Sequence, residues 1–305
     1  MAPEPISPRH RVEETAGNRG FYDVLVDDKN LNSLDVRPSL GTYLTQLWER
    51  RHFIWLDARS RAFSTERDLR LGRAWLILQP LLDAAFYGLM FGVVLRTARG
   101  IENFPGFVVV GITFFGIING LFSQGSGLLR GSRGMISAFH FPKASLVFAA
   151  MLRRVLDSIP NIMVAIIVTL VGQWGEPIKP TIFAVIPLLI LAVLFGTGLM
   201  FITARLTALW PDSRVIISFV SRAWFFLSGI FFDVTRYAET SKMHFVMGNN
   251  PGYLFLDAFR GAIMRGQWPD WHTWTVLSAW AFGAFILGFL FFWRAEERYI
   301  NVVFD

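Results

Sequence analysis

The sequence contains no cysteine, and this absence removes several kinds of chemistry at once. Disulfide bonds, zinc sites built from thiolates and thiol nucleophiles are all excluded. No G-x-x-x-x-G-K-S/T motif occurs either, because none of the four lysines follows a glycine: they are Lys29, Lys143, Lys179 and Lys242. The chain therefore cannot bind ATP through a P-loop.

The histidines show no metal-ligand spacing, since they are scattered along the chain at His10, His52, His140, His244 and His272. We therefore expect no metal site, no cofactor and no catalytic site on this chain. The first twenty residues hold no apolar run, so we expect no secretory signal there. The formal net charge is +6. Basic loops on the cytosolic side of a membrane explain this charge better than a nucleic-acid partner does.

What the sequence does contain is apolar: 53% of the residues are hydrophobic, including 30 phenylalanines and 11 tryptophans. Charged residues are segregated, which leaves long uncharged runs. About 20 apolar residues in a helix cross the ~30 Å hydrocarbon core of a bilayer. We therefore expect an all-α integral membrane protein with six transmembrane helices, at residues 75–95, 107–128, 155–171, 182–204, 215–232 and 276–293. An amphipathic lead-in from Ala144 precedes the third of these spans.

Four regions follow from this pattern. We expect residues 1–38 to be a polar cytosolic tail, residues 39–74 an amphipathic helix and linker at the cytosolic interface, residues 75–293 the transmembrane domain, and residues 294–305 a cytosolic C-terminal tail. In the second region apolar residues recur at helical spacing after Ser39, which is a good helix N-cap. A helix that packs on a protein partner is the alternative for this region.

The arginines and lysines near the ends of the spans set the expected orientation. Most lie on the side that also holds both termini, and the other side holds only Arg96, Arg99 and Lys179. Because positive residues favour the cytosolic side, both termini should be cytosolic. The connection between the last two spans, about residues 233–275, is long and semi-apolar, so it should form re-entrant or interfacial helices on the outer side.

Charged residues inside the expected spans point to paired or functional positions. Asp83 in the first span and Arg222 in the fifth lie at a similar depth from the cytosolic end. We hypothesise that these two charges face each other or share a hydrated pathway. At the start of the third span, Arg153 and Arg154 of the lead-in precede Asp157 by about one helical turn, which predicts a structural ion pair.

Four segments together resemble a known family: ERDLRLGRAWLILQPLLDAAFYGLMFGVVL (66–95), FHFPKASLVFAAMLRRVLD (139–157), ARLTALWPDSRVIISFVSRAWFFLSGIFFD (204–233) and NNPGYLFLDAFRGAIMRG (249–266). They are similar to the ABC-2 type permeases that export polysaccharides such as O-antigen, teichoic acid and capsule. The arginine-rich composition and the block that begins at Trp210 look most like the actinobacterial and mycobacterial branch, which exports cell-wall galactan. The resemblance covers about residues 40–300, and the long polar tail before it departs from the family pattern.

This resemblance implies the transmembrane subunit of an ATP-driven exporter in the bacterial plasma membrane. Such permeases form a homodimer with two copies of a separate ABC ATPase subunit, which binds ATP and Mg. The residues that would couple this chain to the ATPase are Arg130, Arg133, His140, Phe141, Pro142, Lys143, Asp212 and Arg214. The substrate would be a polysaccharide linked to a lipid, often through polyprenyl diphosphate, which passes along a channel between the protomers.

The channel candidates that we carry over are mostly aromatic: Asp83, Tyr87, Phe114, Phe115, Arg222, Trp224, Phe225, Phe226, Phe231 and Phe232. Aromatic rings stack on the C–H faces of sugars without gripping any one unit, and arginine binds a diphosphate through paired hydrogen bonds. For each ring, packing against lipid or a neighbouring helix is the alternative. The alternative functions are an ABC-2 exporter of lipids or drugs, a polytopic membrane glycosyltransferase and a secondary transporter. The last two would need acidic clusters or repeated halves, which the sequence does not show.

Overall fold

The computed structural model describes residues 39–62, 74–87, 89–90, 103–139, 141–173, 179–232 and 242–301, apart from a few side chains within these ranges. They all belong to one compact unit, residues 38–305. Every regular element among the described residues is a helix, which confirms the expected all-α class. The expected cytosolic tail, residues 1–38, lies outside the described ranges.

Long helices alternate with short ones along the chain. The elements are α1 (Leu40–Glu49), α2 (Arg51–Arg61), α3 (Trp75–Tyr87), α4 (Phe104–Gln124), α5 (Leu128–Gly131), α6 (Arg133–Ala138), α7 (Ala144–Gly172), the 3₁₀ helix η4 (Pro180–Ala184), α8 (Val185–Leu209), α9 (Ser213–Leu227), α10 (Lys242–Gly248), α11 (Pro251–Arg260), the π-helix η6 (Gly261–Arg265), α12 (Trp271–Trp293) and α13 (Arg298–Asn301).

Four of the described helices are long and apolar enough to cross a membrane: α4, α7, η4 together with α8, and α12. They coincide with the second, third, fourth and sixth expected spans. Helix α7 is continuous over 29 residues, with Pro160 in its interior. The expected lead-in from Ala144 and the third span are therefore a single helix, because membrane helices tolerate an internal proline.

The first and fifth expected spans are shorter in the described part of the chain. Helix α3 covers only the start of residues 75–95, and residues 91–102 lie outside the described ranges. Helix α9 has 15 residues and ends at Leu227, whereas the sequence predicts a helix to Phe232. Gly229 explains this early end, because its φ of 67° is the left-handed conformation that terminates helices. The total of six spans stays a prediction.

The amphipathic region after Ser39 is divided into two consecutive helices, α1 and α2. The hydroxyl of Ser39 accepts a hydrogen bond from the Thr42 N–H at 3.3 Å, so this residue is the N-cap that the sequence predicts. Outside the packed side of these helices, Trp48 and Trp55 are exposed. A short helix with exposed tryptophans suits the headgroup region of a bilayer.

Close packing of α8 on α12 forms the most extensive contact between two elements. Gly198 of α8 faces the main chain of Ala284, and Gly288 of α12 faces the carbonyl of Gly198, so neither glycine leaves room for a Cβ atom. Small residues let membrane helices approach closely enough for van der Waals contact to hold them together.

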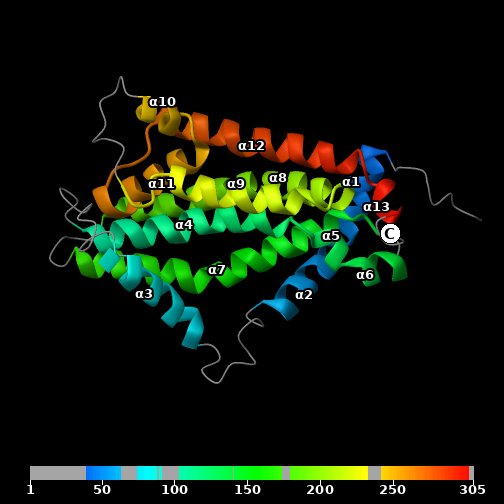
Figure 1. The fold of residues 1–305 in the computed structure, drawn as a ribbon, viewed down its shortest axis with the longest axis horizontal. Helices are drawn as coiled ribbons and strands as arrows, with labels where there is room; N and C mark the ends of the chain where they lie inside the picture. The colour runs from blue at the N-terminus through cyan, green and yellow to red at the C-terminus, as the bar shows by residue number, and fades with distance from the viewer. Residues whose placement is uncertain are drawn as a thin grey trace, which may run out of the picture. The chain divides into compact units, whose positions relative to one another are not determined.

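The short helices gather at the two ends of the long ones. In Figure 1 the axes of α4, α7, α8 and α12 are roughly parallel to one another, with α1, α5, α6 and α13 toward one end and α10 and α11 toward the other. We call these the α6 end and the α11 end. Among the described residues, the expected cytosolic segments lie at the α6 end, and the expected outer segment, residues 233–275, is represented at the α11 end by α10 and α11.

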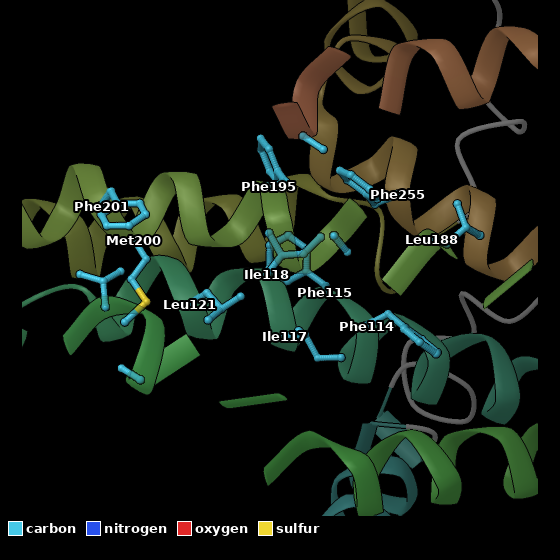
Figure 2. Close-up of a cluster of buried hydrophobic side chains, with 14 of the residues drawn as sticks. Phe114, Phe115, Ile117, Ile118, Leu121, Leu188, Phe195, Met200, Phe201 and Phe255 are labelled. Atoms are coloured by element: carbon cyan, nitrogen blue, oxygen red, sulfur yellow. The ribbon is translucent and has the colours of Figure 1, made fainter. Parts of the chain in front are cut away.

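The core lies where α4, α8 and α11 meet. Figure 2 shows its buried side chains, which include Phe115 and Leu121 of α4, Phe195 and Phe201 of α8, and Phe255 of α11. Helix α11 is too short to cross a bilayer, yet it packs on both α4 and α8. It therefore enters the helix bundle, as a re-entrant helix would.

Candidate functional site

Trp224 of α9 is the centre of an aromatic cluster. Its ring centroid lies 5.1 Å from that of Phe115, 6.0 Å from that of Phe122 and 6.3 Å from that of Phe195, all in edge-on geometry. Edge-on pairs place the positive rim of one ring on the negative face of another. The indole N–H donates a hydrogen bond to Asn250 Oδ1 at 2.8 Å. Helices α4, α8 and α9 and the start of α11 therefore converge on this one indole.

A second aromatic group follows along α9 and the bend after it. The ring of Phe225 lies 5.5 Å from that of Phe226 and 5.6 Å from that of Phe231. Phe231 is buried and Phe232 is partly buried, whereas Phe226 is 60% exposed. The bend after Leu227 therefore folds the end of the segment back onto α9 and leaves one ring on the surface.

Two other channel candidates, Phe114 and Phe115, are buried inside the chain. Each is only 1% exposed, and the ring of Phe114 stacks on that of Phe259 in α11, with centroids 4.0 Å apart. In the single chain these rings pack the re-entrant helix against α4. They do not form a free surface along which a substrate could slide.

Helix α9 exposes a broad apolar face beside these clusters. Ile216, Phe219, Val220 and Phe226 recur at helical spacing, and each is at least 43% exposed. A cavity of about 650 Å³ opens next to this face, between α8, α9 and α12, and most of the groups that line it are apolar. Trp224 closes one side of this cavity, so the aromatic cluster and the cavity share a wall.

The structure does not pair Asp83 with Arg222 within the chain. Helix α3, which carries Asp83, packs on α7 and α4, whereas α9, which carries Arg222, packs on α4 and α8. Among the described side chains no ion pair joins these two residues. The side chain of Tyr87 lies outside the described part. A shared pathway for Asp83 and Arg222 stays a prediction.

Two residues of the family-like segment 249–266, which the sequence interpretation did not include among the site candidates, organise the α11 end. Asn250 caps α11 by accepting the Gly252 N–H at 3.0 Å. Arg260, at the other end of α11, is 2% exposed, and its guanidinium donates to the carbonyls of Gly229 and Ile230. Their position in the sequence could have indicated a role, because these polar residues stand at the two ends of an apolar helix that is too short to span a membrane.

At the α6 end a buried carboxylate joins three distant segments. Glu296, just after α12, accepts the Tyr43 hydroxyl at 2.8 Å and the Lys143 main-chain N–H at 2.8 Å. The Lys143 ammonium lies 3.6 Å from the same carboxylate. Tyr43 in turn accepts the Ala144 N–H at 3.1 Å. This network, Tyr43–Lys143–Glu296, fixes α1, the start of α7 and the segment after α12 to one another.

Burial shapes the ionisation of this network. Desolvation raises the pKa of the Glu296 carboxyl, while the charge and N–H of Lys143 and the hydroxyl of Tyr43 act in the opposite direction. Desolvation, with the negative charge of Glu296, raises the pKa of the Tyr43 phenol well above its ordinary value. The phenol therefore keeps its proton and serves as the donor to Glu296.

The residues predicted to couple to an ATPase divide into buried and exposed sets. Phe141, Pro142 and Lys143 are buried, and Phe141 packs its ring 5.9 Å from that of Phe53. Arg130 and Arg133 are half-buried, and His140 lies outside the described residues.

Asp212 and Arg214, at the turn from α8 to α9, are exposed. The sequence interpretation missed two exposed aromatic residues nearby, Phe139 at 67% and Trp210 at 69%. A hydrophobic residue in a loop carries no periodicity that would have marked it as exposed.

The charges predicted to pair in α7 take two different partners. Arg153 Nε lies 3.5 Å from Asp157 Oδ2, one helical turn away. Arg154 instead turns toward α4, where its Nη2 donates to the Gly116 carbonyl at 2.7 Å. Gly120, one turn further along α4, leaves the space that this guanidinium occupies. As for metals, the described residues include no cluster of His, Asp and Glu that could hold an ion.

Comparison with known proteins places this helical arrangement in a family. The family described as ABC-2 type transporter matches residues 55–264, which is more than half of the chain. The O-antigen export system permease protein RfbA of Myxococcus xanthus is 24% identical over 212 residues, which cover 68% of this chain and 79% of that protein. The family match, residues 55–264, includes the long apolar helices α4, α7 and α8 and the re-entrant α11. This chain is therefore a multi-pass membrane protein that belongs to the family of ABC-2 type transporters.

Proposed function

We propose that the chain is the transmembrane subunit of an ATP-driven transporter that exports a lipid-linked polysaccharide across the bacterial plasma membrane. The observation that carries this proposal is the similarity to a permease of an O-antigen export system over most of the length of both proteins. The exposed ring of Phe226 and the cavity wall formed by Trp224 suit a glycan, because rings stack on sugars without selecting a single unit. A cell-wall galactan is the specific substrate that we propose.

In this proposal α3 and α9 belong to the first and fifth of six spans, and both termini lie in the cytosol. The exposed apolar face of α9 then faces a second copy of the chain, and the export path runs between the two copies. Arg222 lies on this exposed helix, where its guanidinium can bind the diphosphate of a polyprenyl carrier through paired hydrogen bonds. The hydrocarbon part of the carrier remains in the bilayer.

The ATPase is a separate subunit that binds at the α6 end. Because Phe141, Pro142 and Lys143 are buried, we propose that they hold α6 in place and that the exposed Phe139 makes the contact. The turn from α8 to α9 adds Trp210 as a second anchor. Exposed aromatic side chains that enter a partner's pocket commonly supply most of the binding energy of an interface.

The function is tested by reconstituting the chain with an ABC ATPase in vesicles that contain a polyprenyl-diphosphate-linked galactan. ATP should drive the glycan across the membrane, and an ATPase variant without its P-loop lysine should not. Delivery without ATP, or ATP-driven movement of lipid but not of glycan, would refute the proposal. The second result would favour the alternative of a lipid exporter.

A paired substitution tests the docking surface. Phe139→Ser should abolish co-purification of the ATPase, because it removes an apolar anchor at the α6 end. Phe245→Ser removes an equally exposed ring, 73% exposed, from α10 at the opposite end, so it should leave co-purification unchanged. Equal retention of the ATPase by both variants would remove Phe139 from the interface.

A further inference from the structure

The end of α9 raises a question of hydrogen bonding. The last carbonyls of any helix lack intrahelical donors, and a main-chain group left without a partner at membrane depth is costly. Helix α9 stops at Leu227 inside the bundle, so the carbonyls of its last turn and of the following bend need donors from elsewhere. Ser228 supplies one of them, because its hydroxyl donates to the Trp224 carbonyl at 2.7 Å.

Helix α11 supplies donors to three more of these carbonyls, from both of its ends. Asn250 Nδ2 donates to the Leu227 carbonyl at 2.9 Å. Arg260 Nη1 donates to the Gly229 carbonyl at 2.9 Å, and its Nη2 donates to the Ile230 carbonyl at 2.8 Å. The two donors are ten residues apart, or about 15 Å along a helix. The end of α9 is therefore held at two separate points by one rigid element.

Arg260 extends the same connection to a third helix. Its Nη2 also donates to the Phe107 carbonyl of α4 at 3.1 Å, and its guanidinium carbon lies 3.3 Å from the centroid of the Phe107 ring. Gly111 makes room for this arrangement, because a Cβ atom there would lie 2.8 Å from Nη2. The planar fork of an arginine can serve several carbonyls at once, which a lysine ammonium on its flexible stem cannot do equally well.

Asn250 connects this framework to the aromatic cluster. Its Oδ1 accepts both the Gly252 N–H and the indole N–H of Trp224. The space is tight, since a Cβ atom on Gly252 would lie 2.7 Å from Ser228 Oγ and 2.9 Å from Trp224 Nε1. One amide group therefore fixes the start of α11, the end of α9 and the orientation of Trp224.

From these contacts we propose that α11 is a brace that positions the outer end of α9, with Asn250 and Arg260 as its positioning residues. The inference rests on the proposed function in one respect: where α9 lines the export path, the brace sets the orientation of Trp224 and of the Phe225–Phe226–Phe231 group along that path. Release of the brace would let the end of α9 move and would disconnect export from ATP hydrolysis.

The position of α9 can be measured without any substrate. The chain has no cysteine, so Ile230→Cys introduces its only thiol, at a side chain that is fully buried in the bend. The rate at which N-ethylmaleimide labels this thiol, in membranes that contain the full-length chain, reports how often the bend opens. Loss of hydrogen bonds to a charged group should raise that rate roughly tenfold or more in Arg260→Gln.

A second variant removes only the donor group of Asn250, which bonds to the Leu227 carbonyl at 2.9 Å and to Ser228 Oγ at 3.4 Å. Asn250→Asp keeps the oxygen that accepts from Trp224 and Gly252 but loses the donor to Leu227, so labelling should rise by a smaller factor. The matched controls are Arg265→Gln and Asn249→Asp. Arg265 forms an exposed ion pair with Asp257, and Asn249 donates only to Phe245 within α10 among the bonds that the structure describes. Neither control should change the labelling rate.

The outcomes separate a positioning role from a structural one. Faster labelling in both brace variants, with normal co-purification and ATP hydrolysis of the ATPase but reduced export, supports the proposal. Labelling that matches the controls overturns it, and so does faster labelling with unchanged export. Loss of ATPase binding together with export would make these residues merely structural and would also overturn it. If the Arg260→Gln variant does not accumulate in the membrane, the labelling rate and the export activity of Asn250→Asp decide the test.

Failure of the proposed function can be distinguished from failure of the brace proposal. In that case the unaltered complex moves no glycan, while the labelling comparison is still interpretable.

Discussion

At the α6 end, Tyr43 and Lys143 share one buried carboxylate, whereas at the α11 end Asn250 and Arg260 bind main-chain carbonyls. Both arrangements connect segments that are distant in the sequence. The first does so with an amine and with a carboxyl group and a phenol whose pKa values are raised by burial. The second uses an amide, which does not titrate, and a guanidinium, which stays charged at any ordinary pH. The α6 end therefore depends on the ionisation of Glu296, whereas the α11 end depends on hydrogen bonds and a cation–π contact whose groups do not change charge with ordinary pH.

The difference follows from the surroundings of each end. Tyr43 and Glu296 lie outside the long apolar helices, at the point where α7 begins, so the main-chain groups that need partners there are the N–H groups of Lys143 and Ala144, which require acceptors. At the α11 end a helix stops inside the bundle, so the groups that need partners are carbonyls. A donor with no acceptor capacity, such as arginine, fits that requirement.

The largest effect should come from breaking the buried ion pair at the α6 end. Glu296→Ala leaves the Lys143 ammonium buried without its partner, which should lower the free energy of unfolding by about 3–5 kcal/mol. Thermal unfolding of the purified chain in detergent measures the change. At the α11 end, Arg265→Ala breaks an ion pair whose side chains are 38% and 44% exposed, so it should cost about 0–1 kcal/mol. Equal losses in both variants would contradict the comparison.

An intermediate effect should come from the helix pair that connects the two ends. Gly198→Ala places a methyl group against the main chain of Ala284, and overpacking of this kind costs about 1–3 kcal/mol. Gly283→Ala is the matched control, because no atom lies within 4 Å of the position that its Cβ would take. Alanine there should be neutral or should stabilise α12 by up to about 1 kcal/mol. Unfolding of both variants at the same temperature would show that α8 and α12 are not closely packed.

The smallest effect should be a pH dependence that belongs to the α6 end alone. Burial raises the pKa of Glu296 above its ordinary value of about 4.3, so in the window between these values the folded chain binds more protons than the unfolded chain. The free energy of unfolding should therefore fall as the pH rises through that window and should level off above it. Lys143, Tyr43 and Tyr299 face this carboxylate, and burial with the negative charge of Glu296 raises the pKa of both tyrosines, so neither tyrosine loses its proton in this range.

Unfolding temperatures measured from pH 4 to pH 8 test this dependence against two variants. Glu296→Gln should lose the slope that the carboxyl group contributes. Asn250→Asp at the α11 end should keep the slope of the unaltered protein, apart from the ordinary titration of its own new carboxylate. A slope that survives in Glu296→Gln would assign the dependence to another acid.

Much of the fold could be predicted from the sequence because membrane helices are marked by length and composition. The runs at 107–128, 155–171, 182–204 and 276–293 correspond to long apolar helices. Ser39 was predicted as a cap from residue type and spacing. The end of α9 was predicted five residues too late. The apolar run continues past Gly229, whereas the helical backbone ends before it.

The candidate site was less accessible from the sequence. Phe114 and Phe115 look like any other rings in an apolar run, and only the approach of α11 buries them. Arg153 and Arg154 precede Asp157 by four and three residues, yet Arg154 reaches across to α4 because Gly120 leaves space for its guanidinium and the Gly116 carbonyl accepts a hydrogen bond from it. Partners that are far apart in the sequence leave no local signal.

By itself, the sequence determined that this is a helical membrane protein without a P-loop or a cysteine, because composition and motifs act through local physical chemistry: the transfer of apolar residues into lipid and the presence or absence of reactive groups. Only the tertiary structure decided that Glu296 contacts Tyr43 and Lys143, and that Asn250 and Arg260 donate hydrogen bonds to the carbonyls at the end of α9. These contacts join residues up to 253 positions apart. Their existence depends on how the helices pack, which no single segment of the chain specifies.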